Sequence, residues 1–414
     1  MNARVFKPFG AGVTRGSLAV AALGIATAVN AAPWEFNPRL EAGYLYDDNY
    51  RLALPGAEQP VDGPMADAEL EMRTLTQTGE FSFAPRVRAT YFSGAEELDS
   101  VDYFARLNWE RRGQRVFTRL LGDYSLQDVV NSELPEVGSG GGLGEPDLGD
   151  SGRVLVDNRR QRFDIRPQMN VEVSERRELQ FEAGYQDVSF EELIDDAQVD
   201  YRVASLSAGL LTRLSPINSL TFRLRGARYD IEQRDSSDGY GAEIQWDRQT
   251  SQETQMYVRA GAQQLDILTA NEFGILAQDS KTAVVGGAGM NFLLGRNELF
   301  LDLSRAVGAS SSGVLVARDQ LRLRWVRAMT PRLSFLAGVR ATHDDQLDEA
   351  SGFSSFTERS YATGDVGLQW RWQEEFSLRV AYDYTWQEFR DATEDATSSG
   401  AMVTVLYQPL QRRR

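Results

Sequence analysis

The stretch Phe376–Gln387 (FSLRVAYDYTWQ) decides the fold of this 414-residue chain. Its even positions carry large apolar or aromatic side chains, and its odd positions carry small or polar ones. Because successive side chains of a β-strand point to opposite faces, one face meets an apolar medium and the other meets water. The pattern is typical of a transmembrane β-barrel, whose outer wall faces lipid and whose inner wall lines an aqueous lumen.

The same alternation recurs along the chain, for example over Phe81–Tyr91, Val101–Trp109 and Phe163–Val173. Each segment approaches the roughly 9–11 residues that a tilted strand needs to cross lipid. Short turn signals lie near Gln77–Gly79, Arg112–Gln114, Ser174–Arg177, Ser215–Asn218, Thr250–Glu253, Gly295–Asn297, Thr330–Arg332 and Gln373–Glu375. These turns join sixteen strands, and Arg39–Asn49 and Ser399–Gln408 add one strand at each end. We predict an all-β, antiparallel up-and-down transmembrane barrel of about 18 strands, with sixteen as the alternative if the first strands are not continuous.

The N-terminus has the layout of a secretory signal peptide. Arg4, Lys7 and Arg15 precede the apolar run Leu18–Val29, and small or apolar residues then lead to a cleavage site after Ala31. We therefore expect residues 1–31 to be removed and residues 32–414 to form a single barrel domain, with a long Gly- and acid-rich loop at about 127–158. The expected location is the outer membrane of a Gram-negative bacterium, with both termini in the periplasm.

Composition excludes several classes of function. The formal net charge of −16 excludes nucleic acid as a partner, because a polyanion needs a basic footprint. The chain has no cysteine and one histidine, which leaves no His/Cys metal cluster. The run Gly138–Gly144 lacks the strand, helix and Lys-Ser/Thr of a phosphate-binding loop. We expect no cofactor, no metal and no enzymatic activity.

His343 is the single histidine, and the alternation around it places it on the outer face, near the rim of the barrel. A Ser–His pair on the lipid side, as outer-membrane phospholipases use, is the alternative interpretation, and no serine motif supports it.

Charged side chains gather on the inner faces of the expected strands. The candidate lumen-lining residues are Arg86, Arg88, Arg106, Arg162, Arg166, Arg223, Arg225, Arg259, Arg322, Arg324, Arg340, Arg379, Asp102, Asp164, Glu172 and Glu243. One interpretation is structural, with opposite charges bracing the wall of a water-filled barrel. The other is a pathway lined with guanidinium groups, which bind carboxylate, phosphate and sugar hydroxyls. Lumen aromatics such as Phe104, Tyr257 and Phe300 add stacking surfaces in that interpretation.

Aromatic residues are expected to form belts at the two membrane interfaces. The turn-side belt consists of Trp109, Trp246, Trp325, Trp370 and Trp372. The opposite belt consists of Tyr91, Tyr124, Tyr201, Tyr229, Tyr240, Tyr361 and Tyr382. Acidic clusters, among them Asp344–Asp345, mark the surface loops on that side, and we hypothesise that the 127–158 loop folds inward as a constriction.

The segment Tyr44–Tyr50 (YLYDDNY) resembles the opening motif of the β-barrel porin 2 family. Leu214–Leu220 (LSPINSL) and Met329–Phe335 (MTPRLSF) resemble its repeated turn-plus-strand units, and the resemblance covers about Asn37–Pro409. The C-terminus departs from the family by running on through Gln408–Arg414 instead of ending on an aromatic residue.

The resemblance implies an outer-membrane channel that conducts a secreted exopolysaccharide through the Arg/acid-lined lumen. The alternative is a general or substrate-selective diffusion porin for small solutes, and a barrel enzyme or adhesin is the alternative of another class. Expected partners are outer-membrane lipid and lipopolysaccharide, the barrel-assembly machinery and, for export, a periplasmic polysaccharide export complex.

Overall fold

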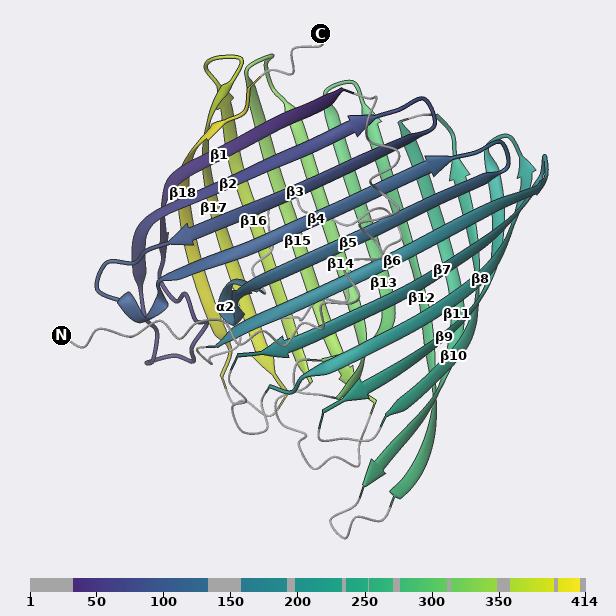
Figure 1. Cartoon of the computed structure of the whole chain (residues 1–414). Helices are drawn as coiled ribbons and strands as arrows, with labels where there is room; N and C mark the ends of the chain where they lie inside the picture. The colour runs from purple at the N-terminus through teal and green to yellow at the C-terminus, as the bar shows by residue number, and fades with distance from the viewer. Residues whose placement is uncertain are drawn as a thin grey trace.

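A computed structural model of the protein shows one antiparallel sheet of eighteen strands that closes on itself (Figure 1). The structure describes residues 33–132, 158–191, 198–232, 236–251, 253–270, 276–310, 314–347, 358–390 and 394–409. The expected signal peptide and the glycine run of the 127–158 loop lie outside the described residues, and both expectations stay predictions.

The strands follow one another around the barrel in chain order, so that each pairs with its neighbours in sequence. Their bounds are β1 (Trp34–Asp47), β2 (Val61–Leu75), β3 (Gly79–Thr90), β4 (Ser100–Arg112), β5 (Val116–Asp128), β6 (Arg159–Ser174), β7 (Arg177–Phe190), β8 (Tyr201–Ser215), β9 (Asn218–Ile231), β10 (Ser237–Gln249), β11 (Thr254–Ala270), β12 (Leu276–Leu294), β13 (Asn297–Ala309), β14 (Leu315–Ala328), β15 (Leu333–Gln346), β16 (Arg359–Arg371), β17 (Phe376–Phe389) and β18 (Ala396–Tyr407).

Short turns join the strands at one end of the barrel, which lies at the top of Figure 1 and is called the turn end below. Longer connections lie at the opposite end, called the loop end. All eight expected turns are confirmed, and with them the eighteen strands, so the sixteen-strand alternative is excluded. Strand β1 begins at Trp34, earlier than the expected Arg39, because Trp34 and Phe36 continue the outward row of apolar side chains.

Two short helical segments interrupt the connections at the loop end: η1 (Glu96–Leu98) and α2 (Val129–Ser132). No helix within the described parts of the chain has both the length and the apolar character needed to cross a membrane.

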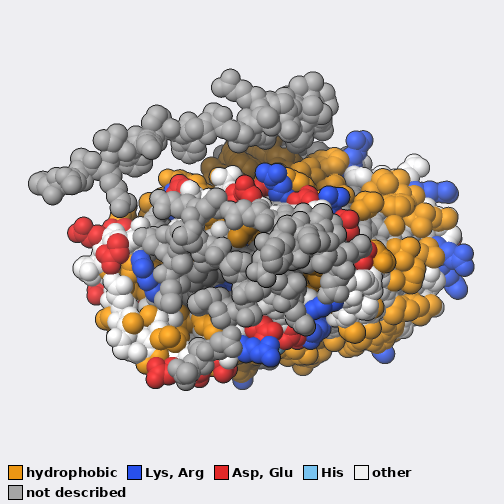
Figure 2. Space-filling model, turned by 90° about the horizontal axis from the view of Figure 1, so that it is seen from below, with side chains coloured by type: hydrophobic (Ala, Val, Ile, Leu, Met, Phe, Trp, Pro, Cys, Tyr) orange, Lys and Arg blue, Asp and Glu red, His pale blue; other side chains and the backbone are white. Residues whose placement is uncertain are grey.

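The wall has two different faces, as the period of two requires. Large apolar side chains cover the outer face, where Leu206 and Val284 are 65% and 68% exposed. Figure 2 shows this apolar outer wall from the loop end, with charged side chains of both signs around the rim. An apolar outside and a polar inside indicate a barrel whose wall lies in lipid.

The expected loop-end tyrosine belt is partly wrong. Tyr91, Tyr240 and Tyr382 are about half exposed on the outer face, as expected. In contrast, Tyr201 and Tyr361 are each 2% exposed and face inward, as does Tyr229. The error arose because these three were assigned by their height along the strand, whereas the alternation of side chains decides which face they occupy.

The barrel closes where β1 pairs with β18, from Leu40↔Tyr407 to Asp47↔Gly400. Side chains reinforce the loop end of this seam. The Asp47 carboxylate accepts hydrogen bonds from Ser398 Oγ at 2.6 Å and from the Asn49 backbone N–H at 2.8 Å. Asn49 is 2% exposed, and its amide donates to the backbone oxygen of Thr397 at 2.9 Å.

The Asn49 side-chain amide also holds the segment that follows β1. Asn49 donates to the Ala53 backbone oxygen at 2.8 Å and accepts from the Ala53 N–H at 2.9 Å. Asp48 adds a contact to β18, because its carboxylate accepts from the Ser399 N–H at 2.7 Å. The Tyr44–Tyr50 motif therefore has a structural role, namely closing the first strand against the last.

Replacing Asn49 with alanine is expected to loosen this seam. The substitution removes the side-chain partner of the buried Ala53 N–H and C=O groups and of the part-buried Thr397 C=O group, at about 1–3 kcal/mol for a buried group that loses its partner. Urea unfolding of the barrel in detergent should show a lower midpoint for Asn49→Ala. Asn297→Ala is the matched control, since Asn297 is only half-buried and its amide donates a long 3.5 Å contact to the Leu294 backbone oxygen. Equal midpoints for the two variants would contradict the role of Asn49.

Candidate transport pathway

The strand register places the candidate lumen-lining residues on the inner face of the wall, opposite the exposed apolar side chains. These residues are Arg86, Arg88, Arg106, Arg162, Arg166, Arg223, Arg225, Arg259, Arg322, Arg324, Arg340, Arg379, Asp102, Asp164, Glu172 and Glu243. They come from nine different strands, so the inner charges surround the lumen and do not form one patch.

Asp67 of β2 holds two of these arginines. The Arg86 guanidinium lies 2.6 Å from the Asp67 carboxylate, and Arg88 Nε lies 3.4 Å from it. Both guanidinium groups also lie over the Phe104 ring, at 5.2 and 5.3 Å from its centroid. Asp67 is not among the expected lumen-lining residues, although its place two residues before Glu69 in the alternating stretch Val61–Leu75 indicates an inward side chain.

A second cluster centres on Asp302 of β13, which is fully buried. Arg322 Nη2 donates to Asp302 Oδ1 at 3.0 Å, and the Tyr257 hydroxyl donates to Oδ2 at 2.7 Å. Arg322 also lies over the Phe300 ring, 5.5 Å from its centroid. A Cβ at Gly289 would come within 2.5 Å of the Tyr257 ring, so the glycine lets the ring lie flat against the wall.

Further opposite charges pair across or along the inner wall. The pairs are Arg223–Glu243 at 2.6 Å, Arg324–Glu298 at 2.6 Å, Arg166–Asp164 at 2.8 Å, Arg119–Glu110 at 3.1 Å, Arg106–Asp123 at 3.7 Å and Arg162–Asp164 at 3.9 Å. Four of these pairs join residues of neighbouring strands, and the sequence alone does not reveal the partners because cross-strand register sets them.

Asp344 was assigned to an acidic surface loop, and the structure corrects this. Asp344 lies within β15, is 2% exposed and faces inward. Arg318 Nε donates to its carboxylate at 2.7 Å and Arg318 Nη2 at 3.1 Å, which makes a buried two-point pair. The sequence does not separate the two acids, because Asp344 and Asp345 stand in one acidic run although they face opposite sides of β15.

Asp102 has a structural contact instead of an open lumen position. It is 1% exposed and accepts from the Asp128 N–H at 2.9 Å, where β5 ends and α2 begins. Together with the paired arginines, this favours the structural interpretation of the inner charges: they brace the wall. The pathway interpretation of the individual residues stays a prediction.

The start of the 127–158 loop reaches two apolar clusters at the loop end. Val129 of α2 packs in a cluster with Val188, Tyr201 and Leu265, which face inward from β7, β8 and β11. Val130 packs in another cluster, formed around the connections between the first four strands. The two valines are each 2% exposed, so α2 is anchored on both sides. The rest of the loop, residues 133–157, lies outside the described residues.

The connections at the loop end also carry local polar contacts. Gln59 donates a hydrogen bond to the carboxylate of Glu97 in η1 at 2.9 Å, and this contact lowers the pKa of Glu97 below its ordinary value. The bond ties the connection between β1 and β2 to the connection between β3 and β4.

The expected turn-side tryptophans lie near the turn end, on the outer face. These are Trp109, Trp246, Trp325, Trp370 and Trp372. The Trp370 and Trp372 rings lie 6.3 Å apart, and Trp372 stacks on Phe376 at 5.8 Å. His343 lies on the outer face toward the loop end, and its side chain is 52% exposed.

No protein-family model and no curated protein sequence matches the chain, so the β-barrel porin 2 resemblance stays a prediction. Among solved structures, the outer-membrane channel DcaP of Acinetobacter baumannii matches at 10% identity and a TM-score of 0.44, over 91% of this chain and 97% of that one. Pseudomonas aeruginosa OccK2 in complex with glucuronate matches at 10% identity and 0.44, over 91% and 99%.

The ferric citrate transporter FecA matches at 12% identity and a TM-score of 0.44, over 86% of this chain. This chain spans 60% of the length of FecA. Identities and TM-scores at this level assign neither a solute nor a residue role to the present chain.

Replacing Arg322 with glutamine is expected to destabilise the barrel strongly. The substitution leaves the buried Asp302 carboxylate without its cation, and breaking a buried pair in this way costs about 3–5 kcal/mol. Urea unfolding measures the loss. Arg106→Gln is the control, because the Arg106 side chain is 61% exposed and its pair with Asp123 spans 3.7 Å. A loss no larger than that of Arg106→Gln would contradict the bracing role of Arg322.

Replacing Val129 and Val130 together with serine is expected to release α2 from its two apolar clusters. If the loop narrows the lumen, single-channel conductance in planar bilayers rises in this double variant. The control is Val171→Ser, on the outer wall near the turn end. An unchanged conductance would contradict the constriction hypothesis.

Proposed function

We propose that this protein is an outer-membrane channel through which small hydrophilic solutes diffuse passively. The observation that carries the proposal is the closed eighteen-stranded wall with apolar side chains outside and charged side chains inside. Barrels with about 16–18 strands are wide enough to enclose an aqueous channel. Such a wall is stable only where lipid surrounds it, and bacterial outer membranes are where barrels of this kind reside.

The arrangement of the inner charges supports diffusion better than tight binding of a polyanion. Arg86 and Arg88 share Asp67, and Arg322 lies against Asp302, so these guanidinium groups already have anionic partners. A polymer would need to displace those carboxylates before it could use the same donors. Paired charges instead give a hydrated lumen with local fields of both signs and modest selectivity.

Export of a secreted exopolysaccharide is the rival function, and it rests on the porin 2 resemblance. The Tyr44–Tyr50 motif, on which the resemblance partly rests, stabilises the β1–β18 seam through Asp47 and Asn49. Since a seam is needed whatever passes through the lumen, this motif does not favour export over diffusion.

The channel proposal predicts a conductance whose ion selectivity follows the inner charges. Replacing Arg86 and Arg88 together with glutamine leaves Asp67 without a cation, so the lumen becomes more negative and the channel more cation-selective. Reversal potentials in a salt gradient across a planar bilayer measure this shift. Arg202→Gln is the matched control, because Arg202 pairs with Asp187 on the outer face and should leave selectivity unchanged.

Two results would decide against diffusion. The first is that the purified barrel conducts no ions in planar bilayers, which contradicts the channel itself. The second is loss of released polysaccharide on deletion of the gene, restored by the intact gene, while uptake of small solutes is unaffected. That second result establishes export.

A further inference from the structure

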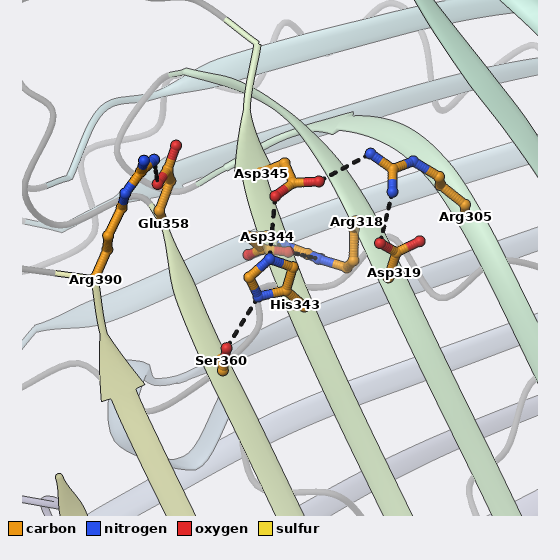
Figure 3. Close-up of polar contacts among 9 residues, drawn as sticks. All are labelled: Arg305, Arg318, Asp319, His343, Asp344, Asp345, Glu358, Ser360 and Arg390. Carbon is orange, nitrogen blue, oxygen red and sulfur yellow. Dashed lines mark hydrogen bonds and ion pairs between the residues drawn. The ribbon is translucent and has the colours of Figure 1, made fainter.

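A row of polar side chains crosses the outer wall near the loop end, over five consecutive strands. Cross-strand register aligns Arg305 of β13, Asp319 of β14, His343 of β15, Ser360 of β16 and Glu388 of β17. Polar groups on the outer face are unexpected in a wall that meets lipid. Arg305, Asp319, His343 and Ser360 are linked by hydrogen bonds that run through Asp345 (Figure 3).

His343 lies between a hydroxyl and a carboxylate. Its Nδ1 lies 2.9 Å from Ser360 Oγ, and its Nε2 lies 3.0 Å from Asp345 Oδ1. The other oxygen of Asp345 accepts from Arg305 Nη2 at 2.8 Å, and Arg305 Nη1 donates to Asp319 at 2.7 Å (Figure 3). A base within hydrogen-bond reach of a hydroxyl, and itself oriented by a third group, is the arrangement that activates a serine nucleophile.

The position of this row matches the depth of lipid ester bonds. The next row toward the turn end is apolar and consists of Leu303, Leu321, Ala341, Ala362 and Trp386. The indole N–H of Trp386 donates to Asp395 at 3.0 Å, on the loop side. Tryptophan prefers the level of the lipid headgroups, so the polar row lies where headgroups meet acyl chains.

A groove of about 660 Å³ runs along the wall at this boundary, and both His343 and Ser360 line it. Small and apolar residues make up much of the rest of its lining, among them Gly286, Ala288, Leu321 and Ala362. The groove lies where β12 stops pairing with β13, at Gly286↔Arg305. A shallow channel of this composition accommodates an acyl chain beside the serine.

We infer that Ser360, His343 and Asp345 form a catalytic triad that hydrolyses an acyl ester of an outer-leaflet lipid. Ser360 Oγ attacks the ester carbonyl carbon while His343 Nδ1 takes its proton. The tetrahedral intermediate then expels the lipid alcohol, which receives that proton from His343. Water, deprotonated by His343, attacks the acyl-serine in turn, and the products are a free fatty acid and regenerated Ser360. Asp345 is a positioning residue, because it holds the imidazole through Nε2.

This activity is independent of the proposed channel, since the triad lies on the outer face and the lumen lies inside. It also differs from the sequence expectation of a barrel without enzymatic activity. That expectation rested on the lack of a serine motif near His343, whereas the serine comes from the adjacent strand, 17 residues along the chain.

The first test uses the purified full-length barrel in detergent with a fluorophosphonate probe, which labels activated serines. We expect labelling of the wild type and its loss in Ser360→Ala. Ser280→Ala is the matched control, because Ser280 is another exposed hydroxyl on the outer face and bonds to Asp266, with no histidine. Heat-dependent electrophoretic mobility checks that each variant is folded. Absence of wild-type labelling, or equal labelling of Ser360→Ala, overturns the proposal.

The second test measures fatty acid release from two substrates that share the ester chemistry, phosphatidylethanolamine vesicles and vesicles containing lipopolysaccharide. Release from one substrate identifies the lipid source, and release from neither overturns the proposal. His343→Gln is expected to lower the rate about 10²–10⁴-fold, the usual contribution of a general base. Asp345→Asn should lower it as well, and Asp345→Glu should restore part of the rate, which a merely structural carboxylate would not do.

Discussion

Every backbone N–H and C=O group within a lipid bilayer has to find a hydrogen-bond partner in the protein, and this constraint governs the whole molecule. A sheet meets it only if it has no free edge, so β1 has to pair with β18. Among the described strands, this seam is the single place where strands distant in sequence meet. Buried side chains strengthen it there, because Asp47 and Asn49 bond to the start of β18. Closure of the sheet encloses a lumen, and the side chains that face this lumen are the ones that meet water within the membrane.

The inner charges follow from the same constraint. A guanidinium group on the wall gains from a carboxylate one strand away, since both are partly removed from water. Asp302 shows the extreme case, because it is fully buried yet receives Arg322 and Tyr257 on its two oxygens. Such clusters link three or four strands laterally. They make the wall rigid and leave the lumen with local charges of both signs, which suits the passage of small solutes better than the retention of one ligand.

The outer wall changes character over one row of residues. On the turn-end side of His343 and Ser360 the outward side chains are apolar or small, whereas at the level of these two residues they form a polar row. In the proposed hydrolytic site this change corresponds to the depth of the lipid headgroups, and the nucleophile meets ester bonds without leaving the wall. The proposed hydrolytic site and the proposed channel therefore use opposite faces of the same strands, and the period of two in the sequence separates them.

The sequence by itself determined the barrel, its eighteen strands and its eight turns, because alternation and turn chemistry are local properties that neighbouring residues reveal. It also determined which arginines face inward. Only the tertiary structure decided the partners: Asp67 for Arg86, Asp344 for Arg318, and Ser360 for His343. These pairs depend on the register between strands, and a shift of one residue would move every side chain to the other face. Register is set by the closed hydrogen-bond ladder as a whole, which no single stretch of sequence contains.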